Sequence, residues 1–284
     1  MDLRVSSTRN ITNAVMLSLS GVCTILVISV LFFILGYLLF HGISALNWNF
    51  FTQLPKPSGE TGGGMANAIV GSGKILLLAT CIGVPIGFLA GVYLAEYSGK
   101  VFAFTIRYVV DLLNGVPSIV IGIVAYALVV RPMKHYSALA GGVALGIMMI
   151  PIAVRTTEEF LRAVPNSLRE GGVALGATRA KTIFTIVVPA AISGLVSGMM
   201  LNLARVAGET APLLFTALGN MFWSRGWLQP IATLPVMIYN DAIAPEEDLH
   251  RQAWAAGFVL LFLVLAINVT ARMIIARGPA GSRR

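Results

Sequence analysis

The chain has 284 residues, of which 57% are hydrophobic and only 11% are charged. Soluble domains are about a quarter charged, so this composition excludes a protein whose whole surface faces water. The formal net charge is +8, but no basic stretch is interleaved with aromatic residues, so the sequence indicates no nucleic-acid partner. We predict an all-α fold: a polytopic bundle of transmembrane helices, surrounded by membrane lipid, that forms one domain over residues 1–284.

Six apolar runs of the chain are long enough for membrane spans, because a helix crosses a bilayer with about 17–25 apolar residues. The third run is interrupted by the polar residues Asp111 and Asn114 and by Pro117. The first run exceeds the apolar region of a signal peptide, so we expect it to remain as the first span. In chain order the runs cover about 14–40, 66–94, 101–130, 138–154, 182–218 and 253–275.

Three of the segments that connect these runs are long and polar. We expect the segments at about 41–65 and 219–252 to be loops on the outer side of the membrane. The segment at about 155–189 is charged, and we expect it in the cytoplasm as two short helices divided around Gly176. Asn166 or Ser167 is suited to cap the first of these helices.

The distribution of Lys and Arg residues predicts the orientation, because cytoplasmic loops carry an excess of them. With the N-terminus inside, 13 of the 20 Lys and Arg residues fall in inner segments and five in outer segments. We therefore expect both termini in the cytoplasm. The inner residues are Arg4, Arg9, Lys100, Arg107, Arg155, Arg162, Arg169, Arg179, Lys181, Arg272, Arg277, Arg283 and Arg284.

Glycines recur every four residues in the second run, at Gly83, Gly87 and Gly91. This spacing places them on one face of a helix. Small residues on such a face allow the backbone of another membrane helix to approach closely. We expect the three glycines to form a helix-packing surface.

Two charged residues interrupt the fifth run. Arg205 and Glu209 are four residues apart, so within one helix they would share a face. Charges inside a membrane are rare and often mark a substrate pathway. Arginine suits an oxyanion because its planar fork bonds two oxygens and stays charged. Glu209 would hold Arg205 in place and temper its affinity, and we include Thr210 in the same expected pathway. A structural ion pair between two helices is the alternative.

Three further charged residues have two interpretations each. Arg155, at the inner end of the fourth run, is either a second pathway residue or an interfacial arginine. Asp111 either faces the pathway or pairs across helices. Lys74 follows Gly73, but the GxxxxGK[ST] phosphate-binding pattern fails around it, so we interpret it as a lysine that extends toward the outer interface.

No motif for catalysis or for nucleotide or metal binding occurs in the chain. Cys23 and Cys81 have no CxxC or Cys/His spacing typical of a metal site, and no HExxH or GxSxG pattern occurs. We therefore expect a non-catalytic subunit without a cofactor of its own. Any ATP and Mg²⁺ would be bound by a partner chain.

The charged segment resembles the EAA loop of ABC importer permeases. Glu170, Gly176, Ile186 and Pro189 match that motif in spacing, while Gly171, Gly172 and Val188 depart from it. The resemblance implies that this loop couples the permease to an ATPase subunit. It assigns that role to Glu170 and Gly176, with the neighbouring residues Arg169, Ala177 and Pro189.

A second resemblance covers nearly the whole chain. The segments GGGMANAIVGSG, AGVYLAEY, LNGVPSIVIG, RTTEEFL, ARVAGETAPLLFTALGNMFW and QPIATLPVMIY occur in this order. They are similar to the permease subunits of phosphate-specific ABC importers. The resemblance implies a type I importer fold in the bacterial inner membrane. It also implies three partners: a homologous second permease, an ATPase dimer and an extracytoplasmic phosphate-binding protein.

Three alternatives remain on the residues alone. The same architecture could carry another oxyanion, such as sulfate or molybdate, because an intramembrane arginine does not distinguish them. A proton-coupled secondary transporter would use Arg205, Glu209 and Asp111 as a relay, but inverted repeats are expected there and none is evident. A membrane enzyme would need a catalytic motif, and none is found.

Overall fold

The computed structural model describes residues 2–57, 59–60, 62–97 and 99–277. Arg283 and Arg284, which entered the charge count, lie outside the described residues, as do the last residues of the predicted domain. Within the described residues the chain is helical. Its β-structure there consists of isolated bridges that join Pro55 to Gly63 and Leu218 to Ile231. The predicted all-α class is confirmed.

Five helices are long and apolar enough to cross a membrane, and a sixth candidate span is a bent pair of helices. The predicted number of about six spans is therefore confirmed. The five are α1 (Asp2–Gly42), α3 (Ala66–Glu96), α7 (Ala138–Arg162), α13 (Glu247–Arg277) and a composite of α9 (Arg179–Thr182), a π-helical turn (Ile183–Val187) and α10 (Val188–Ala207). The bent pair is α4 (Lys100–Gly115) and α5 (Ser118–Ala125), which continues through a π-helical turn (Tyr126–Val130) into α6 (Arg131–Met133).

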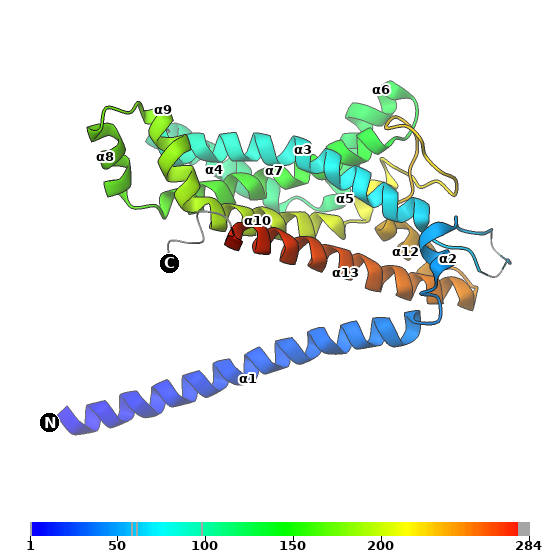
Figure 1. Cartoon of the computed structure of the whole chain (residues 1–284), viewed down its shortest axis with the longest axis horizontal. Coiled ribbons are helices and arrows are strands. Elements are labelled where there is room, and N and C mark those ends of the chain that lie inside the picture. The colour runs from blue at the N-terminus through cyan, green and yellow to red at the C-terminus, as the bar shows by residue number, and fades with distance from the viewer. Residues whose placement is uncertain (1, 58, 61, 98, 278–284) are drawn as a thin grey trace.

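The long helices other than α1 lie side by side in a bundle, and α1 diverges from it along most of its length (Figure 1). One end of the bundle carries α8 (Asn166–Ala174) and α9, and we call it the α8 end. The opposite end, called here the α2 end, carries α2 (Trp48–Thr52) and α12 (Leu234–Ala242). The helix α1 begins on the side of the α8 end and contacts the bundle through α13.

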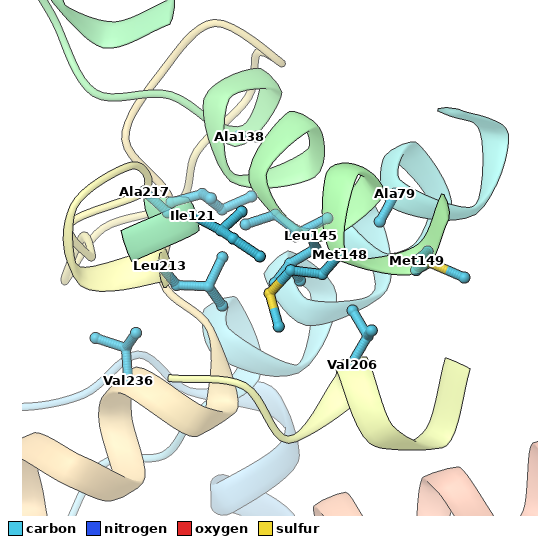
Figure 2. Close-up of a cluster of buried hydrophobic side chains, with 12 residues drawn as sticks. Ala79, Ile121, Ala138, Leu145, Met148, Met149, Val206, Leu213, Ala217 and Val236 are labelled. Carbon is cyan, nitrogen blue, oxygen red and sulfur yellow. The ribbon is translucent and has the colours of Figure 1, made fainter. Parts of the chain in front are cut away.

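Helix α7 is the centre of the bundle. It supplies Ala138, Leu145, Met148 and Met149 to the largest buried cluster, which Figure 2 shows. Side chains of α3, α5 and α10 surround α7 in this cluster, and residues from the segment after α10 complete it: Leu213, Ala217, Ile231 and Val236. The candidate functional residues of α7 and α10 are therefore attached to this core, whereas α4 packs against α7 through a second cluster that contains Ala103, Val110 and Val154.

The glycine stripe of α3 lies directly against α7. A Cβ atom on Gly83 would lie 2.6 Å from the Cβ atom of Met149, and one on Gly87 would lie 2.9 Å from the carbonyl oxygen of Ile150. A Cβ atom on Gly91 would lie 2.8 Å from the carbonyl oxygen of Val154. The close contact between α3 and α7 thus depends on glycine at these three positions.

The third span breaks where the sequence places polar residues and a proline. Helix α4 ends at Gly115, and Val116 has an extended backbone (φ −69°, ψ 128°). A residue before proline is disfavoured in the helical region, and Pro117 is the N-cap residue of α5. The two halves meet at 100°. The second half is fixed by tertiary packing, because Gly122 lies against Pro212 of α11 (Ala211–Leu214).

The fifth apolar run is not one helix, and this corrects the prediction for Arg205 and Glu209. Helix α10 ends at Ala207, and Gly208 is its C-terminal cap. Glycine favours helix ends, and Pro212 cannot continue a helix because it lacks a backbone N–H. Glu209 therefore lies in the turn after α10. It does not share a helix face with Arg205.

Three other boundaries differ from the prediction. Helix α7 extends to Arg162, so Arg155 lies within a membrane-length helix and not in the loop. Helix α13 begins at Glu247, where two acidic residues in the first turn favour a helix N-terminus. The cap of α8 is Pro165, which makes no side-chain cap bond. The Asn166 oxygen instead accepts a hydrogen bond from Arg169, so the capping prediction is wrong.

Candidate functional site

Charged side chains of α4 and α7 form a cluster toward the α8 end, here called the arginine cluster. Helix α4 contributes Arg107 and Asp111, which are four residues apart. Helix α7 contributes Arg155, Glu158 and Arg162, at spacings of three and four residues. Each set occupies one face of its helix. The two faces meet, because two ion pairs of the cluster join one helix to the other: Arg107 with Glu158, and Arg155 with Asp111.

Glu158 is the centre of the arginine cluster. Its side chain is only 5% exposed, and its carboxylate faces three guanidinium groups. The Arg107 Nε atom donates to Oε1 at 2.6 Å. Arg162 Nη2 lies 3.1 Å from Oε1, and Arg155 Nη1 lies 3.7 Å from Oε2. A buried carboxylate is stable only when it is paired, so Glu158 fixes Arg107 of α4 against α7.

Arg155 and Asp111 form the outer part of the cluster. The Arg155 Nε atom donates to Asp111 Oδ1 at 2.9 Å, and its Nη2 atom contacts Oδ2. The pair is two-pronged, which is the strongest arrangement for arginine and a carboxylate. It is also open to solvent, since the Arg155 side chain is 36% exposed and that of Asp111 57%. The cluster lines a cavity of about 500 Å³ together with Glu159.

Of the cluster residues, Arg155 and Asp111 were predicted from the sequence, whereas Arg107, Glu158 and Arg162 were not. Arg107 and Arg162 entered only the charge count that indicates orientation. A signal was present, because acids and bases at helical spacing occur in the third apolar run and directly after the fourth. Only the rotation of α4 against α7 shows that the two faces meet.

Arg205 lies in the last turn of α10, beside the break between α4 and α5. Its side chain is exposed and lines a narrow cavity of about 20 Å³ with Asn114, Met148 and Ile152. Among the described residues neither Arg205 nor Glu209 has an ion-pair partner. The prediction that Glu209 holds Arg205 is therefore wrong, because α10 ends between them. The hydroxyl of Thr210 donates to the carbonyl oxygen of Pro235 at 3.4 Å.

The loop at the α8 end contains the short helix α8 and the turn at Gly176, as the sequence predicts. The second predicted short helix is not separate, because α9 continues through the π-helical turn into α10. Gly176 lies between α8 and α9 with φ of +83°, a conformation that residues with a Cβ atom rarely adopt. Glu170 is exposed, and Leu175 at the tip is 89% exposed. The backbone N–H of Ala177 donates to the carbonyl oxygen of Gly172 at 3.2 Å. Pro189 lies in the first turn of α10, directly after a π-helical turn.

Arg169 anchors this loop to the bundle. Its Nη2 atom donates to Glu96 of α3 at 2.8 Å and to the carbonyl oxygen of Leu161 at 2.6 Å. Its Nη1 atom donates to the carbonyl oxygen of Val164 and to Asn166. The Glu96 side chain is 8% exposed and that of Arg169 20%. The guanidinium group is therefore used within the chain, where it joins α8 to α3 and α7.

The two glycines that depart from the EAA pattern have different surroundings. A Cβ atom on Gly172 would lie 2.7 Å from Thr182 Cγ2 and 2.9 Å from Ile186 Cδ1. A Cβ atom on Gly171 would meet nothing within 4 Å. The packing of α8 against the following helix thus explains glycine at position 172. Nothing in the structure explains glycine at position 171.

We predict opposite effects for alanine at these two positions. Gly171→Ala should stabilise the helix by about 0.5–1 kcal/mol, because alanine loses less backbone entropy than glycine. Gly172→Ala should destabilise the protein by about 1–3 kcal/mol through overpacking against Thr182 and Ile186. Thermal unfolding of the solubilised protein measures both variants. Shifts of equal sign would contradict the packing described for Gly172.

The chain matches a family whose description is binding-protein-dependent transport system inner membrane component. The match covers residues 83–277, which include every element from the glycine stripe to α13. The chain therefore belongs to this family of inner membrane transport subunits.

Its similar relatives narrow the assignment. The phosphate transport system permease protein PstA of Yersinia pestis is 46% identical over 237 residues, which are 83% of this chain and 80% of the relative. PstA of Haemophilus influenzae is 44% identical over 266 residues, 93% of this chain and 94% of the relative. A probable PstA of Methanocaldococcus jannaschii is 36% identical over the same shares. Within the family, the chain belongs with the PstA permease proteins.

Solved structures show the same fold. A chain of an inward-facing MetNI methionine ABC transporter is 21% identical, with a TM-score of 0.58, over 74% of this chain and 95% of that one. A chain of an alginate ABC transporter in complex with a periplasmic protein is 13% identical, with a TM-score of 0.64, over 98% of both. At these identities the likeness concerns the fold alone. The predicted type I importer permease fold is thereby confirmed.

Proposed function

We propose that this chain is the membrane permease subunit of an ATP-driven importer of inorganic phosphate. One observation carries the proposal: PstA permease proteins are 36–46% identical to it over most of its length. The arrangement of charges agrees with the substrate. Arginines lie at two depths of the bundle, the exposed Arg205 beside the helix break and the partly exposed Arg155 toward the α8 end, and arginine binds phosphate oxygens well.

The proposed pathway runs along the exposed sides of α4, α7 and α10. We assign to it Arg205, Glu209, Thr210, Arg155 and Asp111. Broken helices and charges at membrane depth are typical of regions that line a pathway. In an alternating-access cycle, Arg205 would be exposed first to the outer side and then to the cytoplasm. This chain would form half of the pathway and a homologous second permease the other half.

The α8 end is the proposed docking surface for an ATPase subunit. Glu170, Gly176 and Ala177 form its tip, which also exposes Leu175. Arg169 and Pro189 connect that tip to the bundle. ATP and Mg²⁺ would be bound, and ATP hydrolysed, by a dimer of the partner subunit. An extracytoplasmic binding protein would deliver phosphate to the α2 end.

Uptake by proteoliposomes tests this function. The permease is reconstituted with its second permease, ATPase and binding protein, and radioactive phosphate uptake is measured with and without trapped ATP. We expect uptake that requires ATP and resists an uncoupler. Uptake that instead requires a proton gradient would indicate a secondary transporter. Stronger competition by sulfate or molybdate than by phosphate would indicate another oxyanion.

We further propose that both termini and the α8 end face the cytoplasm, as the distribution of Lys and Arg indicates. The test uses a variant whose Cys23 and Cys81 are replaced by alanine. A single cysteine at position 60 or 246 should react with an impermeant thiol reagent from outside. A cysteine at position 167 should react only after the membrane is opened. Labelling of position 167 from outside would contradict the orientation.

A further inference from the structure

The arginine cluster contains two ion pairs of different character. Glu158 is 5% exposed and its partner Arg107 is 26% exposed, so this pair is largely withdrawn from solvent. Asp111 is 57% exposed, and it holds Arg155 over an open cavity of about 500 Å³. Separating a buried pair leaves an uncompensated charge in a poorly solvated place, whereas separating an exposed pair costs little. The first pair is fixed, and the second can be exchanged.

In the exchangeable pair, Asp111 occupies the edge of the Arg155 guanidinium group that an oxyanion would bind. Its Nε and Nη2 atoms form one edge of the guanidinium fork, and Asp111 takes both. A phosphate ion bonds the same two-pronged edge. The remaining nitrogen, Nη1, faces Glu158 at 3.7 Å. Phosphate could therefore bind Arg155 through this edge only after the Asp111 carboxylate has moved away.

We propose that Asp111 is a resident carboxylate that competes with phosphate for Arg155. This inference rests on the proposed function. When the pathway is empty, Asp111 occupies the guanidinium edge. An arriving phosphate displaces Asp111 into the open cavity, while Glu158 keeps Arg155 and Arg107 in position. The return of Asp111 then expels phosphate toward the α8 end, because the carboxylate and the phosphate carry like charges and share one partner.

This arrangement gives Asp111 a role in release and not in capture. A free Arg155 beside Arg107 and Arg162 would hold a phosphate ion strongly, since three cations would then share Glu158 as their only paired carboxylate. A pathway needs weak binding at its exit, because conduction requires that the ion leave. The competing carboxylate lowers the affinity of the exit without removing the arginine that attracts the ion.

The experiment measures inhibition by phosphate on the inner side. The complete importer is reconstituted into proteoliposomes with ATP inside, and the lumen is loaded with rising concentrations of inorganic phosphate. The initial rate of ATP-driven uptake gives a half-inhibitory lumenal concentration. For Asp111→Asn this concentration should fall about tenfold or more, because a charge-assisted competitor is lost. Asp111→Glu should stay close to the wild type.

Glu159 provides a matched control. It lines the same cavity and is exposed, and among the described residues it has no ion-pair partner. Glu159→Gln removes the same charge without freeing a guanidinium group, so its half-inhibitory concentration should not change. Equal shifts in both variants would indicate a general charge effect and overturn the proposal. An unchanged value in Asp111→Asn would overturn it as well.

Two features keep the outcome interpretable. Should Asp111→Asn not assemble, Asp111→Ser makes the same test, because it also removes the carboxylate from an exposed position. Failure of the proposed function would look different: the wild-type importer itself would not accumulate phosphate. If the wild-type importer accumulates phosphate normally and neither Asp111→Asn nor Asp111→Ser changes the half-inhibitory concentration, only the proposal of a competing carboxylate is rejected.

Discussion

Replacement of Arg205 by glutamine should abolish phosphate uptake while the subunit remains inserted and assembled. The side chain is exposed and has no ion-pair partner among the described residues, so its removal leaves no buried charge uncompensated. The stability change should therefore stay within about 0.5 kcal/mol, as for other exposed substitutions. Loss of uptake can then be attributed to the missing guanidinium group. Uptake and co-purification of the partner subunits are measured on the same preparation.

Arg272→Gln is the matched control, because Arg272 is another exposed arginine on a membrane-length helix. It should transport at nearly the wild-type rate. The charge exchange Arg205→Glu with Glu209→Arg should not restore uptake, since α10 ends between the two positions and their side chains form no pair. Normal transport by Arg205→Gln would show that Arg205 is an interfacial residue outside the pathway.

Replacement of Arg169 by alanine should uncouple ATP hydrolysis from transport and weaken the protein. Arg169 donates to Glu96 and to the carbonyl oxygens of Leu161 and Val164. Its loss leaves the Glu96 carboxylate nearly buried without that partner, which costs about 3–5 kcal/mol. With α8 no longer fixed to α3 and α7, a movement imposed on its tip would not reach the bundle. We expect fewer phosphate ions transported per ATP hydrolysed.

The measurement is the ratio of phosphate uptake to ATP hydrolysis in one preparation. Arg169→Lys should give an intermediate ratio, because lysine keeps the charge but lacks the planar fork that reaches several acceptors at once. The matched control is Arg179→Ala. Arg179 is an exposed arginine, and together with Arg169 it lines a cavity of about 560 Å³. A wild-type ratio in Arg169→Ala would rule out the transmission of movement through this residue.

Most of the fold could be predicted from the sequence, because local composition indicates where membrane helices form. The apolar runs predicted the six candidate spans. The third run is interrupted at Pro117 in the sequence, and the helix breaks there in the structure. Gly176 gave the division between α8 and α9. In each case the cause lies within a few neighbouring residues. These features could be predicted because hydrophobicity and backbone preferences act between near neighbours in the chain.

The residues of the candidate site could be predicted only in part, because its contacts join different helices. Arg205 and Glu209 were expected to pair, but Gly208 and Pro212 end the helix around them. Glu158 lies in the segment that was predicted to be a charged loop, yet in the structure its buried carboxylate pairs with three arginines. The resemblance placed Arg169 in the coupling loop, and the structure adds the contacts with Glu96 and Leu161 that join this loop to the bundle.

The sequence by itself thus determined where the helices run, since hydrophobicity and backbone preferences act over short distances. Only the tertiary structure decided which charges meet. Partners such as Arg107 and Glu158 are 51 residues apart, and their contact depends on how α4 is rotated and shifted against α7. That rotation is set by the packing of many apolar side chains together, and no short stretch of the sequence specifies it.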